Sequence, residues 1–299
     1  MKVLKDKNCF ITGAAKGIGR SFAIALAEEG MNLFITDIDL ENLEKVKNEI
    51  EKLGVKVHAG KCDVSKFEDF VNVAKEFYSK LGDVDLLINN AGISIAGAVN
   101  NLELEDWKNV LDVNLWSVIH SLKAFLQRML ERGSGHIANV ASINGIIGGP
   151  DPIPYITSKF AVVGLSEALY GQLINRGINV SVILPSYIRT DIYDKSKIRF
   201  PKKLIDDTGE QKLEEFRKLM VHGYNRTASS PDRVIKKYIK GIKENQLYIF
   251  DANWALSVMA LKGNSPQKYQ DSLKNIHENY FNTMKETFLK IGINIEDYM

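Results

Sequence analysis

The sequence is poor in the features that mark secreted, membrane-spanning and nucleic-acid-binding proteins. Only two of its 299 residues are cysteines, Cys9 and Cys62, too few for a disulfide framework, and we expect both to be buried, reduced thiols. The net charge of +2 gives no basic excess that would attract nucleic acid. The longest nearly apolar stretch, Trp254 to Leu261, is too short to cross a bilayer. The first ten residues lack the apolar core of a signal peptide. These absences predict a cytoplasmic protein with no membrane span and no nucleic-acid partner.

Short β-rich runs alternate with amphipathic helical stretches through most of the chain. The runs show little polar alternation, which is typical of strands buried on both faces of a sheet. Such an alternation predicts an α/β fold of the Rossmann type, with a doubly wound, mostly parallel seven-stranded sheet. The expected strands are Asn8–Thr12, Asn32–Thr36, Val55–Ala59, Asp85–Asn89, His136–Ala141, Asn179–Leu184 and Leu247–Phe250.

Two segments depart from this alternation. Residues 187–227 form a long insert before the next helix starts at Ser230-Pro231-Asp232, and an insert at this point is more often a functional lid than a passive loop. It carries a basic cluster: Lys195, Lys197, Arg199, Lys202 and Lys203. Residues 253–299 read as helical. We expect one dinucleotide-binding domain over residues 1–252, with 253–299 as a helical C-terminal tail of the same domain.

A glycine-rich turn closes the first strand and opens the first helix, which we expect over Ser21–Glu29. The turn reads Thr12-Gly13-Ala14-Ala15-Lys16-Gly17-Ile18-Gly19. Its glycines let the backbone approach a pyrophosphate, which the free N–H groups and the dipole of a helix N-terminus attract. The alternative is an ordinary glycine-rich turn, but its place after the first strand favours dinucleotide binding.

Asp37 ends the second strand, where a carboxylate can accept both ribose hydroxyls of an adenosine. The same carboxylate would repel a 2′-phosphate, which favours NAD over NADP. Lys16 argues the other way, because a cation in the glycine turn could neutralise that phosphate. No arginine follows Asp37 to complete a phosphate site. We therefore expect NAD, with NADP as the alternative; Asp37 could also merely cap the following helix.

Tyr155 and Lys159 are four residues apart, which places both side chains on one face of a helix. Pro152 and Pro154 just before them fit the start of that helix. A tyrosine with an ordinary pKa of about 10 is a poor base at neutral pH. We expect the ammonium of Lys159 and a bound oxidised nicotinamide to lower the pKa of Tyr155, which could then exchange a proton with an alcohol oxygen.

Taken together and in order, these motifs resemble the classical short-chain dehydrogenase/reductase family. The resemblance covers about Lys5 to Asp251. The motifs that carry it are Thr12 to Gly19, Cys62-Asp63-Val64, Asn89 to Gly92, Asn114, Ser142, Tyr155 to Lys159 and Pro185 to Thr190.

The resemblance implies a role for each matching residue. The implied catalytic residues are Asn114, Ser142, Tyr155 and Lys159. Ser142 would hold the substrate oxygen, Lys159 would also bind the nicotinamide ribose, and Asn114 would hold a water that links Lys159 to solvent. The expected cofactor-binding residues are Gly13, Ala15, Lys16, Gly17, Ile18, Gly19, Asp37, Asp63, Val64, Asn90, Ala91, Gly92, Tyr155, Lys159, Pro185, Ile188 and Thr190. In place of the family's usual Pro-Gly, however, this chain has Pro185-Ser186, and serine accepts fewer backbone angles.

The implied reaction interconverts a secondary alcohol and a ketone by hydride transfer. No cluster with metal-ligand spacing is visible, so we expect no metal. Residues expected along the substrate pocket suggest an apolar, steroid-like or other lipid-like alcohol: Ser94, Ile95, Ile143, Ile146, Ile147, Tyr187, Ile192 and Tyr193. The alternatives are a non-catalytic dinucleotide-binding regulator and a nucleotide-sugar epimerase or dehydratase.

The helical stretches Trp107–Leu130 and Tyr155–Ile174 carry more apolar residues than one core-facing stripe requires. In the resembled family the corresponding helices commonly form an interface between subunits. We expect a homodimer or homotetramer. The alternative is that the C-terminal tail covers these helices within one chain.

Overall fold

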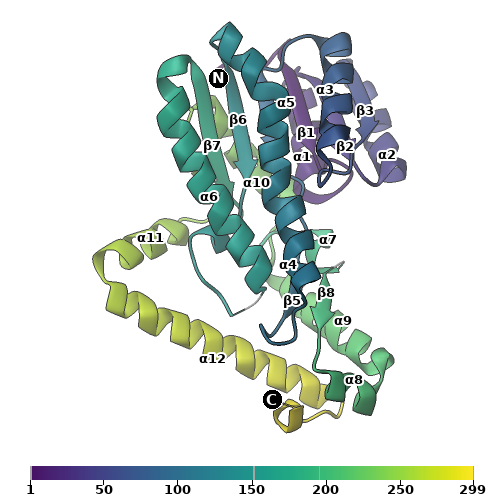
Figure 1. The fold of residues 1–299 in the computed structure, drawn as a ribbon, viewed down its shortest axis with the longest axis vertical. Coiled ribbons are helices and arrows are strands. Elements are labelled where there is room, and N and C mark those ends of the chain that lie inside the picture. Colours follow the sequence, from purple (N-terminus) through teal and green to yellow (C-terminus); the bar gives the residue numbers. More distant parts are fainter. Residues whose placement is uncertain (1, 151, 195, 299) are drawn as a thin grey trace.

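The computed structural model describes residues 2–150, 152–194 and 196–298, so Lys195 of the basic cluster lies outside the described residues. Seven parallel strands form one sheet in the order β3-β2-β1-β4-β6-β7-β9 (Figure 1). They are β1 (Asn8–Thr12), β2 (Asn32–Asp37), β3 (Val57–Lys61), β4 (Leu86–Asn89), β6 (Gly135–Val140), β7 (Ile178–Leu184) and β9 (Tyr248–Phe250). The strand order reverses between β1 and β4, which confirms the predicted doubly wound fold and marks where such sheets bind ligands.

Helices cover both faces of the sheet. On one face lie α1 (Gly17–Glu28), α2 (Leu40–Glu51) and α10 (Pro231–Lys243), and on the other α3 (Phe67–Leu81), α5 (Ser117–Arg132) and α6 (Ile153–Leu173). Successive strand residues belong to opposite cores: Ile11 packs with the first set of helices, and Phe10 with the second. This double burial explains why the strands show no polar alternation in sequence.

Some predicted boundaries move. The third strand starts at Val57, not Val55, because the turn after Gly54 is longer than expected. Helix α1 starts at Gly17, not Ser21, so the glycine turn runs directly into its first turn. The structure adds a π-helical turn, Asp112–Trp116, between α4 (Leu104–Leu111) and α5. It also adds a small parallel sheet of β5 (Ile95–Gly97) and β8 (Lys197–Arg199).

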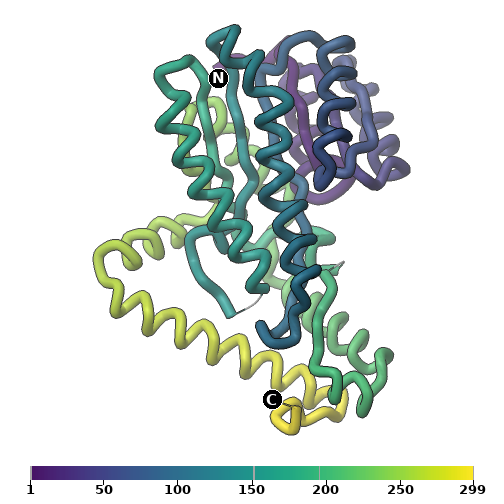
Figure 2. The backbone as a smooth tube through the Cα atoms, viewed as in Figure 1, coloured from purple at the N-terminus to yellow at the C-terminus, as the bar shows by residue number. Residues whose placement is uncertain are grey.

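The insert and the tail meet in a small core of their own. The insert contains α7 (Asp191–Asp194), β8, α8 (Lys202–Thr208) and α9 (Glu210–Thr227), and the tail contains α11 (Trp254–Asn264) and α12 (Pro266–Lys290). Figures 1 and 2 show α12 running past the end of the sheet to reach α8 and α9. Their shared core buries Leu204, Leu213, Phe216, Phe288, Ile291, Ile293 and Ile295. The end of the tail therefore supports the insert.

Among the described residues, no helix is long and apolar enough to cross a membrane. Cys9 and Cys62 are both buried free thiols, as expected.

Candidate active site

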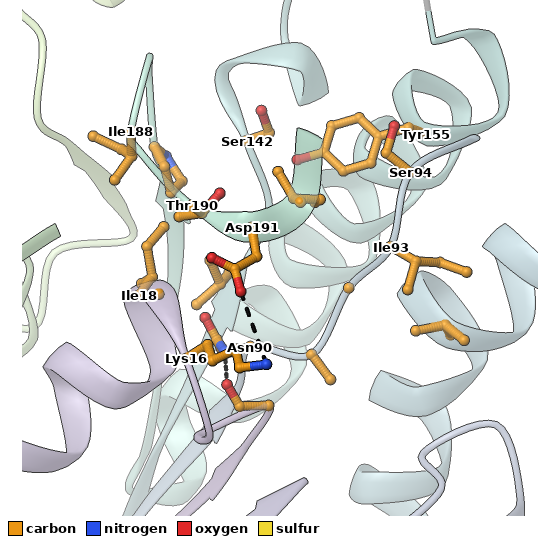
Figure 3. A pocket seen from close by; sticks show the side chains of 18 of the residues that line it. Lys16, Ile18, Asn90, Ile93, Ser94, Ser142, Tyr155, Ile188, Thr190 and Asp191 are labelled. Atoms are coloured by element: carbon orange, nitrogen blue, oxygen red, sulfur yellow. Dashed lines mark hydrogen bonds and ion pairs between the residues drawn. The ribbon is translucent and has the colours of Figure 1, made fainter. Parts of the chain in front are cut away.

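A cavity of about 400 Å³ lies at the carboxyl ends of the strands. Figure 3 shows Lys16, Ile18 and Asn90 on one side of it and Ser142, Tyr155 and Ser94 on the other. Almost every residue expected at the site lines this cavity; Gly19 and Asn114 pack behind its wall.

The glycine turn needs its glycines for two different reasons. Gly13 and Gly17 adopt φ angles of +65° and +55°, which side chains disfavour. A Cβ at Gly19 would lie 2.1 Å from the carbonyl oxygen of Gly13, so this position has no room for one. Lys16 precedes α1 and makes no side-chain cap there. The first N–H groups of α1 are therefore arranged as in a phosphate-binding helix N-terminus.

Asn90 holds this turn in place. Its Nδ2 donates to the carbonyl oxygens of Thr12 and Gly13, each at 3.0 Å. The Thr12 hydroxyl oxygen in turn accepts from the N–H groups of Asn90 and Ala91, at 3.0 and 3.1 Å. Asn90 thus joins the ends of β1 and β4 and shapes the cavity as well as lining it.

Two carboxylates and one lysine surround the end of β2. Asp37 accepts from the N–H groups of Ala15 (3.0 Å) and Asp39 (2.9 Å). Lys16 Nζ lies 2.8 Å from Asp39 Oδ2 and 4.0 Å from Asp191 Oδ2. The hydrogen bond from Lys16 holds the pKa of Asp39 far below its usual value. Sequence reasoning did not single out Asp39; the signal was its position immediately before a helix.

Asp63 and Val64 line the cavity after β3. The Asp63 carboxylate accepts from the N–H and hydroxyl of Ser65, at 3.2 and 2.6 Å, and Lys66 Nζ lies 3.3 Å away. The Ser65 hydroxyl is the main cause of the lowered pKa of Asp63. Asp63 is therefore ionised and fixed in place.

Tyr155 and Lys159 lie one turn apart on α6, which begins after Pro152 as predicted. Ser142 follows β6, and its hydroxyl oxygen accepts from the N–H of Asn144 at 3.1 Å. Lys159 Nζ donates to the Val140 carbonyl at 2.9 Å and lies 5.4 Å from the centre of the Tyr155 ring. The site thus gathers the hydroxyls of Ser142 and Tyr155 beside one buried ammonium.

The protonation of this group differs from the expectation. Burial raises the pKa of Tyr155, and only its hydrogen bond with Ser142 acts in the opposite direction. Burial also lowers the pKa of Lys159 to about 8. In the chain without cofactor, burial therefore outweighs any lowering of the Tyr155 pKa by Lys159, whose ammonium is directed at Val140. The lowering expected with a bound oxidised nicotinamide stays a prediction.

Asn114 lies in the π-helical turn and ties three segments together. Its Oδ1 accepts from the Ile93 N–H at 2.8 Å, and its Nδ2 donates to the Ile93 carbonyl at 3.0 Å and to Ser158 Oγ at 2.9 Å. A Cβ at Gly92 would lie 3.4 Å from Asn114 Oδ1 and 3.6 Å from Lys159 Nζ. The turn, the strand-end loop and α6 therefore meet at Asn114.

Ser186, which replaces the family's usual glycine, is anchored by Asp251 at the end of β9. Its N–H donates to Asp251 Oδ1 at 2.8 Å, and its hydroxyl donates to the other carboxylate oxygen. The preceding Pro185 carbonyl accepts from the Ile143 N–H at 2.9 Å. These bonds fix the loop that brings Ile188 and Thr190 to the cavity.

The expected substrate pocket is right in part. Ser94, Ile192 and Tyr193 line the cavity. The other five residues do not: Ile95, Ile143, Ile146 and Ile147 are buried in local packing, and Tyr187 is mostly exposed. The apolar character of the four isoleucines serves local packing and not the cavity.

Tyr224 is the main cavity residue that sequence reasoning missed. It comes from α9, and its ring centre lies 4.0 Å from that of Tyr193. Its hydroxyl donates to the Ile188 carbonyl at 3.3 Å. No local motif marks Tyr224, because only the folding of the insert brings α9 over the cavity.

A sequence model described as short chain dehydrogenase matches residues 7–199. The chain belongs to the short-chain dehydrogenase/reductase family. It is 35% identical over 211 residues to the 3-oxoacyl-(acyl-carrier-protein) reductase FabG of Staphylococcus epidermidis, a match that covers 70% of this chain and 83% of the relative. It is 34% identical over 260 residues to a CLA biosynthesis dehydrogenase/reductase of Lactiplantibacillus plantarum, covering 83% and 89%.

A solved short-chain dehydrogenase/reductase from Burkholderia phymatum, in complex with NAD, shares the fold with a TM-score of 0.79 and 29% identity. The match covers 89% of this chain and 96% of that one. With the family established, the protein is a short-chain dehydrogenase/reductase of the oxidoreductase class.

Proposed function

We propose that the protein interconverts a secondary alcohol and a ketone, with NAD as its cofactor. The observation that carries the proposal is one cavity that joins the glycine turn to the group of Ser142, Tyr155 and Lys159. A nicotinamide dinucleotide, when bound, supplies or accepts the hydride. The glycine turn, Asp37, Asp63 and the loop after Pro185 would hold it.

The residues of the chain supply the proton chemistry. Ser142 and Tyr155 would both hydrogen-bond the substrate oxygen, and Tyr155 would give that oxygen its proton during reduction or remove it during oxidation. Because burial raises the pKa of Tyr155, its hydroxyl stays protonated at neutral pH, a form suited to donating. Lys159, with a pKa lowered to about 8, can exchange a proton near neutral pH. Asn114 would position both α6 and Ile93.

Asp37 supports NAD, since its carboxylate lines the cavity and would repel a 2′-phosphate. Lys16, the residue that could favour NADP, is paired with Asp39. The solved relative with bound NAD is consistent with this choice.

We propose an apolar, neutral substrate for the part of the cavity that lies beyond the cofactor-binding residues. Ile192, Tyr193 and Tyr224 line it, and the basic residues along the described part of the cavity are Lys16 and Lys159 only. Neither is suited to a substrate carboxylate, because Lys16 pairs with Asp39 and Lys159 belongs to the catalytic group. Within the lipid-like class, the relative named as a 3-oxoacyl reductase favours an acyl ketone over a steroid. We further propose that residues 1–252 are the catalytic domain and 253–299 its extension.

Two measurements test the proposal. Absorbance of the reduced nicotinamide shows which acyl ketones, steroids and other alcohols the wild type turns over, and the turnover of Tyr155→Phe is then compared with it. The variant keeps ring packing but loses the proton-transferring oxygen, so turnover should fall by at least about a hundredfold with NAD affinity nearly unchanged. Tyr78→Phe, which removes a hydroxyl far from the cavity, is the matched control and should keep full activity. More than about a tenth of wild-type turnover in Tyr155→Phe would reject Tyr155 as the acid–base group. Binding of the cofactor without net redox on any substrate would favour a regulator or an epimerase.

A further inference from the structure

We propose that Asp39 is a cofactor-specificity residue that keeps Lys16 from a 2′-phosphate and thereby favours NAD over NADP. The inference rests on the proposed function and assigns a role to a residue beyond Asp37. Lys16 is the only cation in the glycine turn, residues 12–19, so its partner decides whether the turn can favour a phosphate.

Lys16 is held by a carboxylate that is itself held in place. Asp39 Oδ2 accepts from Lys16 Nζ at 2.8 Å and from Asn42 Nδ2 at 2.8 Å. Asp39 Oδ1 caps α2 by accepting from the Asn42 N–H at 3.2 Å. The carboxylate therefore cannot turn away without losing the helix cap. A pair anchored in this way competes for the lysine more effectively than a mobile surface pair.

The charges around the adenosine end of the cavity support the same conclusion. Asp37 and Asp39 bring two negative charges, Lys16 brings one positive charge, and Asp191 lies 4.0 Å from that lysine. A phosphate monoester adds between about 1.5 and 2 negative charges at neutral pH. Since Lys16 already faces Asp39 and Asp191, a 2′-phosphate would meet a net negative environment. Removal of the Asp39 charge lessens the repulsion and takes away the carboxylate that lies 2.8 Å from the lysine.

The experiment measures the dissociation constants of NADH and NADPH from the nicotinamide fluorescence of Asp39→Asn, without any substrate. Asparagine is also a good helix cap, so α2 should be preserved. We expect NADPH to bind about tenfold more tightly than to the wild type, and NADH to change by less than about threefold. Asp39→Ser, another capping residue, provides a second variant should the first fold poorly.

Two further variants separate the role of Lys16 from general repulsion. Lys16→Met combined with Asp39→Asn should lose most of the gain for NADPH. Glu41→Gln removes an exposed charge from the same turn of α2, where Glu41 pairs with Lys45 and not with Lys16, and should change neither affinity. An unchanged NADPH affinity in Asp39→Asn, or a gain that persists in the double variant, overturns the proposal.

Failure of the proposed function gives a different result. If no alcohol or ketone is turned over while NADH binds and NADPH responds to Asp39→Asn, the reaction is wrong and the role of Asp39 stands. If the wild type prefers NADPH, both the NAD assignment and this role of Asp39 are wrong.

Discussion

Burial governs the charge of Lys159. Its side chain is 3% exposed and donates to a backbone carbonyl. Burial alone lowers its pKa, and no carboxylate among the described residues contributes to the shift. The pKa falls from 10.5 to about 8, so the folded chain binds fewer protons than the unfolded chain between these values. Stability therefore rises with pH over this window, and the full cost of the buried charge is present below pH 8.

Lys159→Met should make the protein more stable at neutral pH while it abolishes turnover. The lowered pKa corresponds to a cost of about 3 kcal/mol for keeping the ammonium charged in the folded state. In the variant the Val140 carbonyl loses its donor, which offsets roughly half of the gain in folding free energy. We expect a net gain of about 1 to 2 kcal/mol at pH 7, measured by urea unfolding. The gap between variant and wild type should shrink from pH 8 to pH 10.5. A gap independent of pH would show that Lys159 is not a strained buried charge.

Most cavity residues could be predicted because they lie at the carboxyl ends of strands or just after them, where a parallel sheet places its ligands. Asp37, Asn90 and Ser142 are examples, and the structure brings them to one cavity. Asp39 was missed although it directly precedes α2, because its pairing with Lys16 is a contact between side chains. Tyr224 could not be predicted, since its position depends on the folding of the insert.

At the scale of elements, the strands were predictable because burial on both faces gives runs that are apolar throughout. The two-stranded sheet of β5 and β8 was not, because strands of three residues carry no periodicity and the partners are about a hundred residues apart. The π-helical turn at Asp112–Trp116 also leaves no sequence pattern, since the bonds of Asn114 to Ile93 and Ser158 are tertiary.

The glycine turn before α1 has no room for a side chain at Gly19, which can be tested with alanine. Gly19→Ala would place a methyl group 2.1 Å from the Gly13 carbonyl oxygen, so the glycine turn must open. We expect NADH affinity to fall by at least about tenfold, the equivalent of 1.4 kcal/mol, in a fluorescence titration. Gly223→Ala is the control: it lies within α9, where no described residue lies within 4 Å of the added Cβ, and should stabilise the protein by roughly 0.5–1 kcal/mol. Normal NADH binding by Gly19→Ala would contradict this account of the turn.

At the scale of the whole molecule, the tail and the insert depend on each other. Phe288 of α12 is buried and stacks on Phe216 of α9, with ring centres 3.8 Å apart. The same helix α9 carries Tyr224 to the cavity. The tail therefore packs against the helix that brings Tyr224 to the cavity, a link that the sequence did not reveal.

Phe288→Ala should loosen the insert and leave the sheet intact. A buried Phe→Ala substitution lowers the free energy of unfolding by about 3–5 kcal/mol. Here the lost packing belongs to the small core that the insert and the tail share, so the destabilisation should be local. We expect faster hydrogen exchange over residues 202–227 and a raised KM for the substrate, with unchanged NADH affinity. Ile276→Ala, on an exposed part of α12, is the control and should change neither. Undiminished protection of α9 would show that the tail does not support the insert.

The outer face of α6 is where we expect a second copy of the chain to bind. Gly164, Ala168 and Gly171 are exposed along one side of this helix, and Trp116 near the start of α5 is 49% exposed. The tail reaches the first turns of α6, where Lys262 lies 4.6 Å from the Phe160 ring centre, but it leaves these residues uncovered. Small residues on a helix let a second copy approach closely, and burial of this face would hold the Tyr155 helix firmly.

We therefore expect a dimer or tetramer of the 33.6 kDa chain in sedimentation at micromolar concentrations. Ala168→Arg should give a folded monomer, because its side chain points to solvent within one chain but would meet the partner in the assembly. Gly263→Arg adds the same side chain to an exposed position on α11 and should leave the assembly unchanged. Turnover should fall in the monomer along with the rigidity of α6, while the NADH affinity set by the glycine turn should persist. A wild-type chain that sediments as a monomer would reject the interface and leave the exposed face of α6 without a partner.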